Sequence, residues 1–327
     1  MRFFSVKSFS ILGVFLAFVV IALGAWTRLA DAGLGCPDWP GCYGFVTFPN
    51  TADEIAIAER LYPDRPVEID KIIPEVVHRY FAASLGLLAI ALLIISFREK
   101  KLLLTTSFLL FVIICQGIFG YLTVSLKLHP LIVTGHLFGA MLTTALFLII
   151  FLKTVDFEGN YKKLHNNKGL LSLGFIFLLG QIFLGAWTST NYAARACLDL
   201  PYCQGELLPE VNFAEGFNLF QTFGPNYLFG HMSNEARVAI HLTHRIGAIV
   251  VFIYSLFLAI RLWSTDTKPF LIAFLAILFL QIFLGVNNVL SHLPLWNAVA
   301  HNLVGVMLFL SMVVMIYISS LKKNVGT

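Results

Sequence analysis

The chain has 327 residues, of which 58% are hydrophobic and 12% are charged. Soluble domains carry about 25% charged residues, so this composition excludes a soluble globular protein. A helix needs about 20 apolar residues to cross the hydrocarbon core of a bilayer. The sequence holds eight such stretches, which predicts an all-α integral membrane protein with eight transmembrane helices. They run over about 9–29, 72–96, 102–124, 131–152, 169–190, 236–260, 269–290 and 296–320.

The first stretch also has features of a signal peptide, because Arg2 and Lys7 precede an apolar run over 11–25. Trp, Thr and Arg occupy 26–28, where a cleavage site needs small residues. We therefore expect a retained helix. No Arg-rich, Ser-rich transit segment precedes it, so we expect a bacterial inner membrane rather than an organelle.

The positive-inside rule sets the orientation. The two ends of the chain and the short connectors after the second, fourth and sixth stretches hold 13 of the 22 basic residues, against 4 acidic residues. Both termini are therefore predicted to be cytoplasmic. The two long loops, about 30–71 and 191–235, are predicted to be periplasmic.

Four of the five cysteines fall in these outer loops, as Cys36 with Cys42 and Cys197 with Cys203. Both pairs are six residues apart, and disulfides persist in the periplasm. We predict one disulfide within each pair. Cys115 lies inside the third stretch, where we expect a small buried hydrophobic residue.

The chain contains an internal repeat. The pentapeptide LGAWT occurs at 23–27 and at 184–188, each time before a loop with two cysteines and a helix with a His-Arg dipeptide. Because the order of features repeats as a whole, we predict two duplicated four-helix bundles in parallel orientation. The first half, 1–160, contains the outer loop 30–71, and the second half, 161–327, contains the outer loop 191–235.

Each even-numbered stretch carries a histidine six or seven residues from its outer end. At the rise of an α-helix this places all four ~10 Å below the outer surface. Ionisable residues inside a span indicate function by default. Two histidines per half at one level fit the two axial ligands of a haem iron, since the porphyrin supplies the other four. These histidines are His78, His136, His244 and His301.

Two other interpretations of these histidines stay open. A zinc site usually needs three or more protein ligands, and Glu75 or His241 could complete such a set. Alternatively, each histidine only hydrogen-bonds a neighbouring helix. The matched depth in a duplicated frame favours haem.

Several nearby residues have two interpretations each. Arg79 and Arg245 follow their histidines and either contact haem propionates, which suit Arg, or form salt bridges and snorkel. His129 and His292 begin the fourth and eighth stretches and are expected to be interfacial, with a propionate contact as the lesser alternative. His165 and His231 lie in loops and receive no assignment.

Glu75 makes the two halves chemically unequal. It stands three residues before His78 and shares a helix face with it, whereas the aligned residue of the second half is His241. We infer that the first half performs chemistry and the second holds a resident cofactor. The alternative is a Glu that only forms a salt bridge with Arg79.

Six motifs together resemble the haem A synthase family over nearly the whole chain. They are G-A-W-T-R-L at 24–29, G-L-G-C-P-D-W-P-G-C-Y-G at 33–44, E-V-V-H-R-Y at 75–80, G-H-L-F-G-A at 135–140, H-L-T-H-R-I-G-A at 241–248 and A-H-N-L-V-G at 300–305.

The resemblance implies oxidation of the C8 methyl of haem O to a formyl group by two successive hydroxylations, through a hydroxymethyl intermediate, haem I. It implies that His244 and His301 are iron ligands of a resident haem b, and that His78 and His136 bind haem O. Glu75 is the implied catalytic residue, because a carboxylate stabilises positive charge that develops at the methyl carbon and can accept a proton.

The resemblance also implies partners. Haem O would come from haem O synthase, the protohaem farnesyltransferase, and haem A would serve haem-copper oxidases. A membrane electron acceptor or donor is required but not identified, no nucleic acid is expected, and a homo-oligomer stays open.

Three other classes of protein remain as alternatives. The nearest is a quinone-linked bis-haem cytochrome b that transfers electrons without modifying haem. A membrane thiol-disulfide oxidoreductase is less favoured because C-x5-C differs from the reactive C-x-x-C motif. A transporter would need broken paired helices that the sequence does not indicate.

Overall fold

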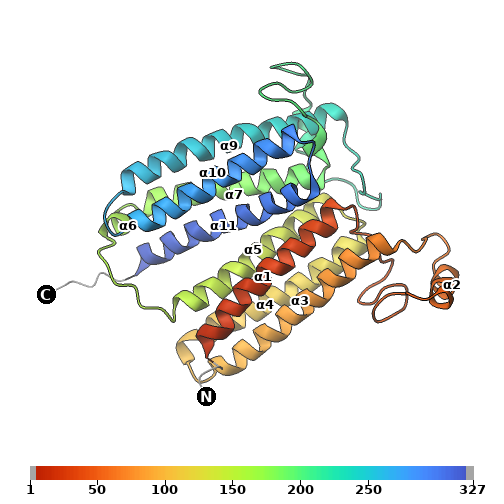
Figure 1. Cartoon of the computed structure of the whole chain (residues 1–327), viewed down its shortest axis with the longest axis horizontal. Helices are drawn as coiled ribbons and strands as arrows, with labels where there is room; N and C mark the ends of the chain where they lie inside the picture. The colour runs from red at the N-terminus through yellow and green to blue at the C-terminus, as the bar shows by residue number, and fades with distance from the viewer. Residues whose placement is uncertain (1–4, 322–327) are drawn as a thin grey trace. The chain divides into compact units, whose positions relative to one another are not determined.

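The computed structural model describes residues 5–321. Over this range the chain forms helices and no extended β-strand (Figure 1). Eight of the described helices are long and apolar enough to cross a membrane, which confirms the predicted all-α membrane fold. They are α1 (Val6–Leu29), α3 (Ile69–Ser96), α4 (Lys100–Ser125), α5 (Pro130–Leu152), α7 (Lys168–Thr190), α9 (Asn234–Leu262), α10 (Lys268–Leu290) and α11 (Leu295–Ser320).

The predicted spans agree with these helices to within three residues at every end. A bilayer core holds no water to hydrogen-bond the backbone, and a single segment can pair all of its own N–H and C=O groups there by forming an α-helix. The length of an apolar stretch therefore predicts the length of the helix. Hydroxyl side chains cap two of the starts: Ser5 accepts from the Ser8 N–H before α1, and Ser233 accepts from the Ala236 N–H before α9. Arg2, Lys322 and Lys323, which contribute to the predicted orientation, lie outside the described residues.

The loops contain short helices that hydropathy alone did not predict. They are α2 (Ala52–Leu61), α6 (Lys162–Asn166), the 3-10 helix η1 (Ala193–Arg195) and α8 (Phe213–Gly216). Helix α2 begins with a capping box, in which the Thr51 hydroxyl accepts from the Glu54 N–H and the Glu54 carboxylate accepts from the Thr51 N–H.

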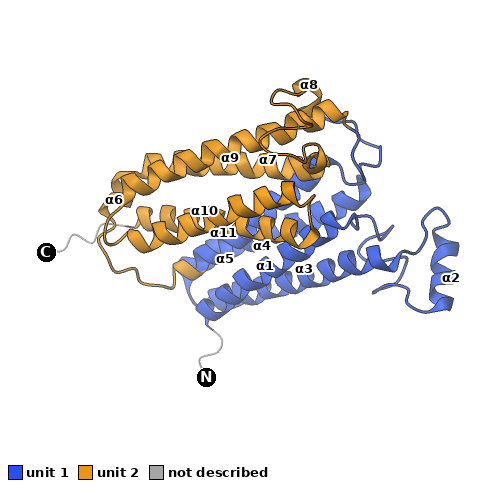
Figure 2. Ribbon diagram, turned by 45° about the horizontal axis from the view of Figure 1, so that its top comes forward, with its two compact units in different colours: residues 1–150, 218–231 blue, residues 151–217, 232–327 orange. Residues whose placement is uncertain are grey.

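The chain divides into two compact units with four candidate spans each (Figure 2). Unit 1 consists of Met1–Ile150 together with Asn218–His231, and unit 2 consists of Phe151–Phe217 and Met232–Thr327. A short stretch of the second long loop therefore belongs to the unit formed by the first four spans.

Unit 1 has a core of apolar side chains from all four of its spans. Helix α3 packs against both α1 and α4. On α1, Gly13 leaves room for the fully buried ring of Phe147 from α5, so any Cβ at this position would collide with that ring. Small residues at such crossings let membrane helices approach closely.

In unit 2, α7 packs against α9, and α10 packs against α11. A buried amide cluster joins the end of α10 to the start of α11. The fully buried Asn297 donates to the Leu284 carbonyl at 2.8 Å and to Asn288 Oδ1 at 2.7 Å, and it accepts from Asn287 Nδ2 at 2.8 Å. A satisfied polar network of this kind fixes the pairing of two helices that apolar contacts alone would leave free to slide.

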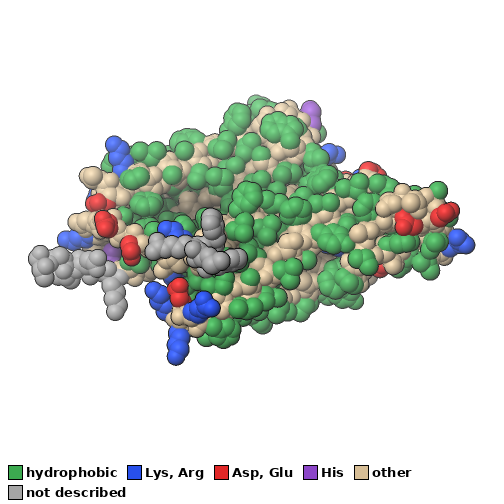
Figure 3. Space-filling model, turned by 60° about the horizontal axis from the view of Figure 1, so that its bottom comes forward, with side chains coloured by type: hydrophobic (Ala, Val, Ile, Leu, Met, Phe, Trp, Pro, Cys, Tyr) green, Lys and Arg blue, Asp and Glu red, His purple; other side chains and the backbone are tan. Residues whose placement is uncertain are grey.

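Figure 3 shows one face of the molecule, on which hydrophobic side chains cover the helices and charged side chains gather near their ends. Large hydrophobic residues such as Phe15, Leu87, Leu104 and Ile260 are exposed. Such a distribution is that of helices surrounded by lipid.

Candidate functional site

His78 on α3 and His136 on α5 lie together inside unit 1. Their ring centroids are 6.4 Å apart, with an interplanar angle of 86°. The Nδ1–H of His78 donates to the Val20 carbonyl at 3.1 Å. Because a carbonyl only accepts, this bond leaves the lone pair on Nε2, as in a metal-binding histidine whose other nitrogen is hydrogen-bonded. In the described part of the chain, His136 Nδ1 is buried without a hydrogen-bond partner.

The spacing of this pair fits two axial ligands on one iron. Metal-to-nitrogen bonds of ~2 Å, with another ~1 Å from each nitrogen to its ring centroid, would separate the two centroids by ~6 Å. In residues 5–321 no group of three or more His, Cys, Asp or Glu side chains could hold a metal ion by itself. The donor set thus suits a haem, whose porphyrin brings four ligands, better than the zinc alternative.

All four predicted histidines share one packing arrangement. Each imidazole lies with its Cε1 atom facing a glycine of a neighbouring helix in the same unit, closely at Gly24, Gly185 and Gly285 and more loosely at Gly120. A Cβ on these glycines would lie 2.9 to 3.8 Å from Cε1. The pairs are Gly24 with His78, Gly120 with His136, Gly185 with His244, and Gly285 with His301.

The repeated pentapeptide contributes two of these glycines. Gly24 and Gly185 are the glycines of the two LGAWT copies, which the sequence identified only as markers of duplication. The structure gives them a physical role, because an absent side chain makes room for an imidazole.

In unit 2, two glutamines contact the histidines. Gln181 Nε2 on α7 lies 3.0 Å from His244 Nδ1 and donates to the His244 carbonyl, also at 3.0 Å. Gln281 Nε2 on α10 lies 3.2 Å from His301 Nε2. Sequence analysis did not select these glutamines. Their signal is a polar amide on an otherwise apolar span, four residues before Gly185 or Gly285.

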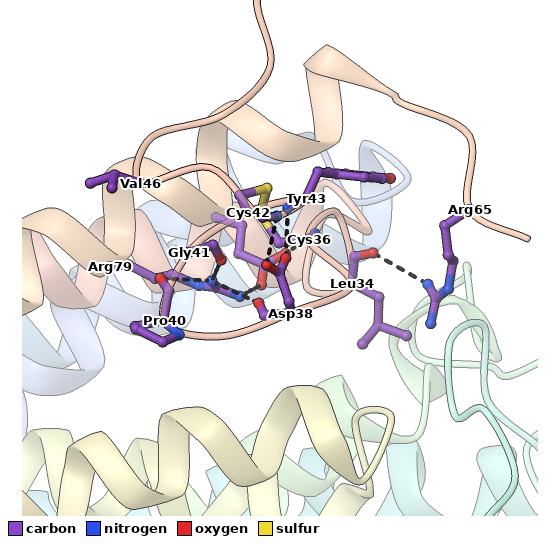
Figure 4. The surroundings of a disulfide bond; sticks show 12 residues. Leu34, Cys36, Asp38, Pro40, Gly41, Cys42, Tyr43, Val46, Arg65 and Arg79 are labelled. Carbon is purple, nitrogen blue, oxygen red and sulfur yellow. Dashed lines mark hydrogen bonds and ion pairs between the residues drawn. A yellow bond between two sulfur atoms is a disulfide. The ribbon is translucent and has the colours of Figure 1, made fainter. Parts of the chain in front are cut away.

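Glu75 is buried beside the first long loop, with 4% of its surface exposed. One carboxylate oxygen pairs with Arg79 Nη2 at 2.6 Å, and the other accepts from the Cys36 N–H at 3.0 Å. Figure 4 shows Arg79 directed into this loop, where its Nη1 donates to the carbonyls of Asp38, Pro40 and Gly41. The salt bridge considered as an alternative for Glu75 is present, and the same bridge connects the carboxylate to the cysteine loop.

Arg245 serves the second loop in the same way as Arg79 serves the first. It donates to the carbonyls of Tyr202 and Cys197, both at 2.9 Å. The aligned partner of Glu75 is the buried His241, whose Nδ1 has no hydrogen-bond partner in the described range. The position aligned with Glu75 is therefore one at which the two units differ chemically.

The two long loops share the same local structure. Disulfides join Cys36 to Cys42 and Cys197 to Cys203. Inside the first loop, Asp38 accepts from the N–H groups of Tyr43 and Gly44, and inside the second, Asp199 accepts from those of Gln204 and Gly205. The pattern that the two loops share is C-x-D-x-P-x-C-x-G.

The electrostatics of the second loop follow from these bonds. The N–H groups of Gly205 and Gln204 hold the pKa of the Asp199 carboxyl below its ordinary value. Hydrogen bonds to the charged form of a carboxylate favour that form. The loop is therefore organised around an ionised Asp199.

The remaining histidines differ from one another. His129, expected at the interface, is 1% exposed, whereas His292 is exposed. His165 Nδ1 donates to the Ser319 carbonyl at 3.2 Å, and His231 Nε2 donates to the Asn226 carbonyl at 2.5 Å. Cys115 is a free cysteine of intermediate exposure rather than the buried residue we expected, because its position on α4 is only partly covered.

These features define a multi-pass helical membrane protein in which each unit holds a pair of intramembrane histidines. Comparison with known proteins makes the assignment specific. The chain belongs to the COX15-CtaA family, described as "Cytochrome oxidase assembly protein", whose model matches residues 7–313.

The chain is similar to three proteins that carry the name "Heme A synthase". The protein of Shewanella oneidensis is 41% identical over 306 residues, covering 91% of this chain and 92% of the relative. That of Halalkalibacterium halodurans is 25% identical over 339 residues, with 98% and 99% coverage. That of Wolbachia pipientis wMel is 24% identical over 322 residues, with 89% and 86% coverage.

Proposed function

We propose that this protein is a haem A synthase, an oxidoreductase that converts the C8 methyl of haem O into a formyl group. Membership of the COX15-CtaA family and full-length similarity to proteins named "Heme A synthase" support the proposal. The observation that carries it is local to unit 1: a buried carboxylate, Glu75, stands one helical turn from His78, and His78 lies 6.4 Å from His136 between ring centroids.

In this proposal the two units have separate tasks. His78 and His136 hold haem O as the substrate, and His244 and His301 hold a resident haem b. When bound, haem b supplies one-electron transfer. The packing of each histidine against a glycine supports an equivalent role in ligand binding, since the space that the glycine leaves is filled by the ring.

Glu75 is the proposed catalytic residue. Oxidation of a methyl group conjugated to a porphyrin develops positive charge at that carbon, and a fixed carboxylate stabilises such charge. Arg79 holds one oxygen and the Cys36 N–H holds the other, so the carboxylate is pre-oriented by the disulfide loop. We assign Arg79 and Arg245 first to positioning these loops. A propionate contact remains the second proposed role of each arginine.

The division of the chain, its membrane orientation and its partner are proposed from the sequence motifs and the distribution of basic residues. The catalytic half is 1–160 and the haem b half is 161–327. The protein spans a bacterial inner membrane with cytoplasmic termini and periplasmic loops. Haem O synthase is the proposed partner that delivers the substrate.

The test is extraction of haems from the purified protein after co-expression with a haem O synthase. The proposal predicts haem B together with haem O, haem I or haem A. The matched control is co-expression with an inactive haem O synthase, from which haem B should be the only haem extracted. Two equivalents of haem B and no modified haem under both conditions would instead indicate a cytochrome b.

A further inference from the structure

Residues 218–231 of the second long loop belong to unit 1 and contact the residues just before α5. The Tyr227 N–H donates to the Lys127 carbonyl at 2.9 Å, and Lys127 Nζ donates to the Gly224 carbonyl at 3.4 Å. Tyr227 also joins an apolar cluster with Leu34 of the first loop and Leu128. This segment covers the outer end of the helix that carries His136.

His129 is the residue that the segment encloses. Its ring stacks on Phe223 with centroids 4.5 Å apart and an interplanar angle of 21°, and it meets Tyr227 edge to face at 5.2 Å. Only 1% of His129 is exposed. His292, which precedes α11 in unit 2, is exposed, so the enclosure is a feature of unit 1.

One nitrogen of this buried ring lacks a partner. His129 Nε2 lies 3.0 Å from the Gln221 carbonyl, which only accepts, so Nε2 carries a hydrogen. In the described part of the chain His129 Nδ1 is buried and unpaired. A buried polar atom without a partner is costly, and few occur in native proteins. This atom therefore indicates a ligand that is bound in the working protein.

His129 is the residue just before α5, which begins at Pro130. It stands seven residues before His136, which places it ~10 Å from His136 along the direction of the helix axis. That displacement is close to the reach of a propionate from the centre of a porphyrin. The ammonium group of Lys127, two residues before His129, adds a positive charge at the same outer end.

We propose that His129 binds a propionate of the substrate haem through Nδ1. With Nε2–H already donated to the Gln221 carbonyl, Nδ1 is the ring atom left to share a hydrogen with the carboxyl group, while the stack on Phe223 fixes the ring. Segment 218–231 is then a specificity element of the unit 1 site. This inference rests on the proposed function, because it takes the ligand of His78 and His136 to be haem O.

The test compares haem O with its dimethyl ester, which lacks the propionate charge. Each is titrated into the full-length protein carrying its resident haem, and binding is followed by absorbance. Charge-assisted hydrogen bonds are the strong ones, so we expect the wild-type protein to prefer the free acid roughly tenfold. His129→Phe keeps an aromatic ring for the stack on Phe223 and should bind acid and ester equally, with affinity for the ester unchanged.

Two further variants separate contact from packing. His129→Gln retains a donor and should preserve part of the preference for the acid, and His292→Phe, at the exposed counterpart, should preserve all of it. A wild-type preference that survives in His129→Phe would overturn the proposal, as would equal binding of acid and ester by the wild type. Conversion of haem O to haem A is assayed separately. If the wild-type protein binds haem O but does not convert it, the proposed function is refuted, whereas the propionate contact is not.

Discussion

The contact between Gly24 and His78 makes a quantitative prediction. A methyl group at Gly24 would lie 2.9 Å from His78 Cε1, whereas comfortable carbon contacts lie at about 3.5–4.0 Å. The ring cannot yield freely, because its Nδ1–H is bonded to the Val20 carbonyl at 3.1 Å. Overpacking of this kind costs about 1–3 kcal/mol. Gly24→Ala should therefore weaken binding of haem O roughly 5- to 150-fold, since 1.4 kcal/mol is tenfold.

The chain offers a graded set of controls for this substitution. A Cβ on Gly120 would meet His136 at 3.8 Å, which is ordinary contact, and a Cβ on Gly117 would meet nothing within 4 Å. The three alanine variants are purified, and their affinity for haem O is measured by absorbance titration. We expect Gly24→Ala to lose more affinity for haem O than Gly120→Ala, and Gly117→Ala to bind haem O as the wild type does. If Gly24→Ala bound haem O as tightly as Gly117→Ala, the close packing of glycine and imidazole would not control the site.

Three further outcomes follow from the structure. Substituting His244 should abolish the resident haem b spectrum and lower the melting temperature, because a ligand bound only by the folded state stabilises that state. Substituting His78 should spare the spectrum. Equal losses of haem b in the two variants would refute the division of tasks between the units. Alkylation under denaturing, non-reducing conditions should label Cys115 alone, as mass spectrometry of peptides would show, and labelling of a loop cysteine would contradict its disulfide. The Ser233 N–H and hydroxyl hold the pKa of Glu215 below its ordinary value, so the stabilising contact between α8 and the start of α9 is complete above about pH 4.3 and is lost as the pH falls through the lowered value. Hydrogen exchange over 213–216 should rise in that acid range for the wild type and already be raised at pH 7 for Glu215→Gln, and identical profiles would exclude the role of this carboxylate.

The sequence predicted the spans well for a physical reason. A run of apolar residues long enough to cross a bilayer has one stable conformation there, so hydropathy determines both the element and its length. The LGAWT repeat also signalled that the two halves share a plan. The intramembrane histidines could be selected because such residues are rare in spans unless they have a role.

Other features depended on contacts between distant segments. Nothing in the aromatic and glycine-rich stretch 218–231 showed that it packs with unit 1 or that it encloses His129. Gly24 carries no side chain, so its role became visible only through the ring beside it. The hydrogen bonds that Arg79 donates could not be predicted from the sequence either, because the carbonyls that accept them lie in a loop about forty residues away.

Replacement of Glu75 tests the proposed chemistry most directly. Glu75→Gln keeps the shape of the side chain and its bond from the Cys36 N–H but removes the charge beside His78. Loss of one electrostatic contact of this type costs ~10²- to 10³-fold in rate. The matched control is Glu68→Gln, an exposed carboxylate just before α3 that makes no side-chain capping bond. Haems extracted from membranes are separated by chromatography. We expect the Glu75→Gln protein to retain haem B and to accumulate haem O or the hydroxymethyl intermediate, with haem A scarce. Haem A formation at the rate of Glu68→Gln would contradict this expectation.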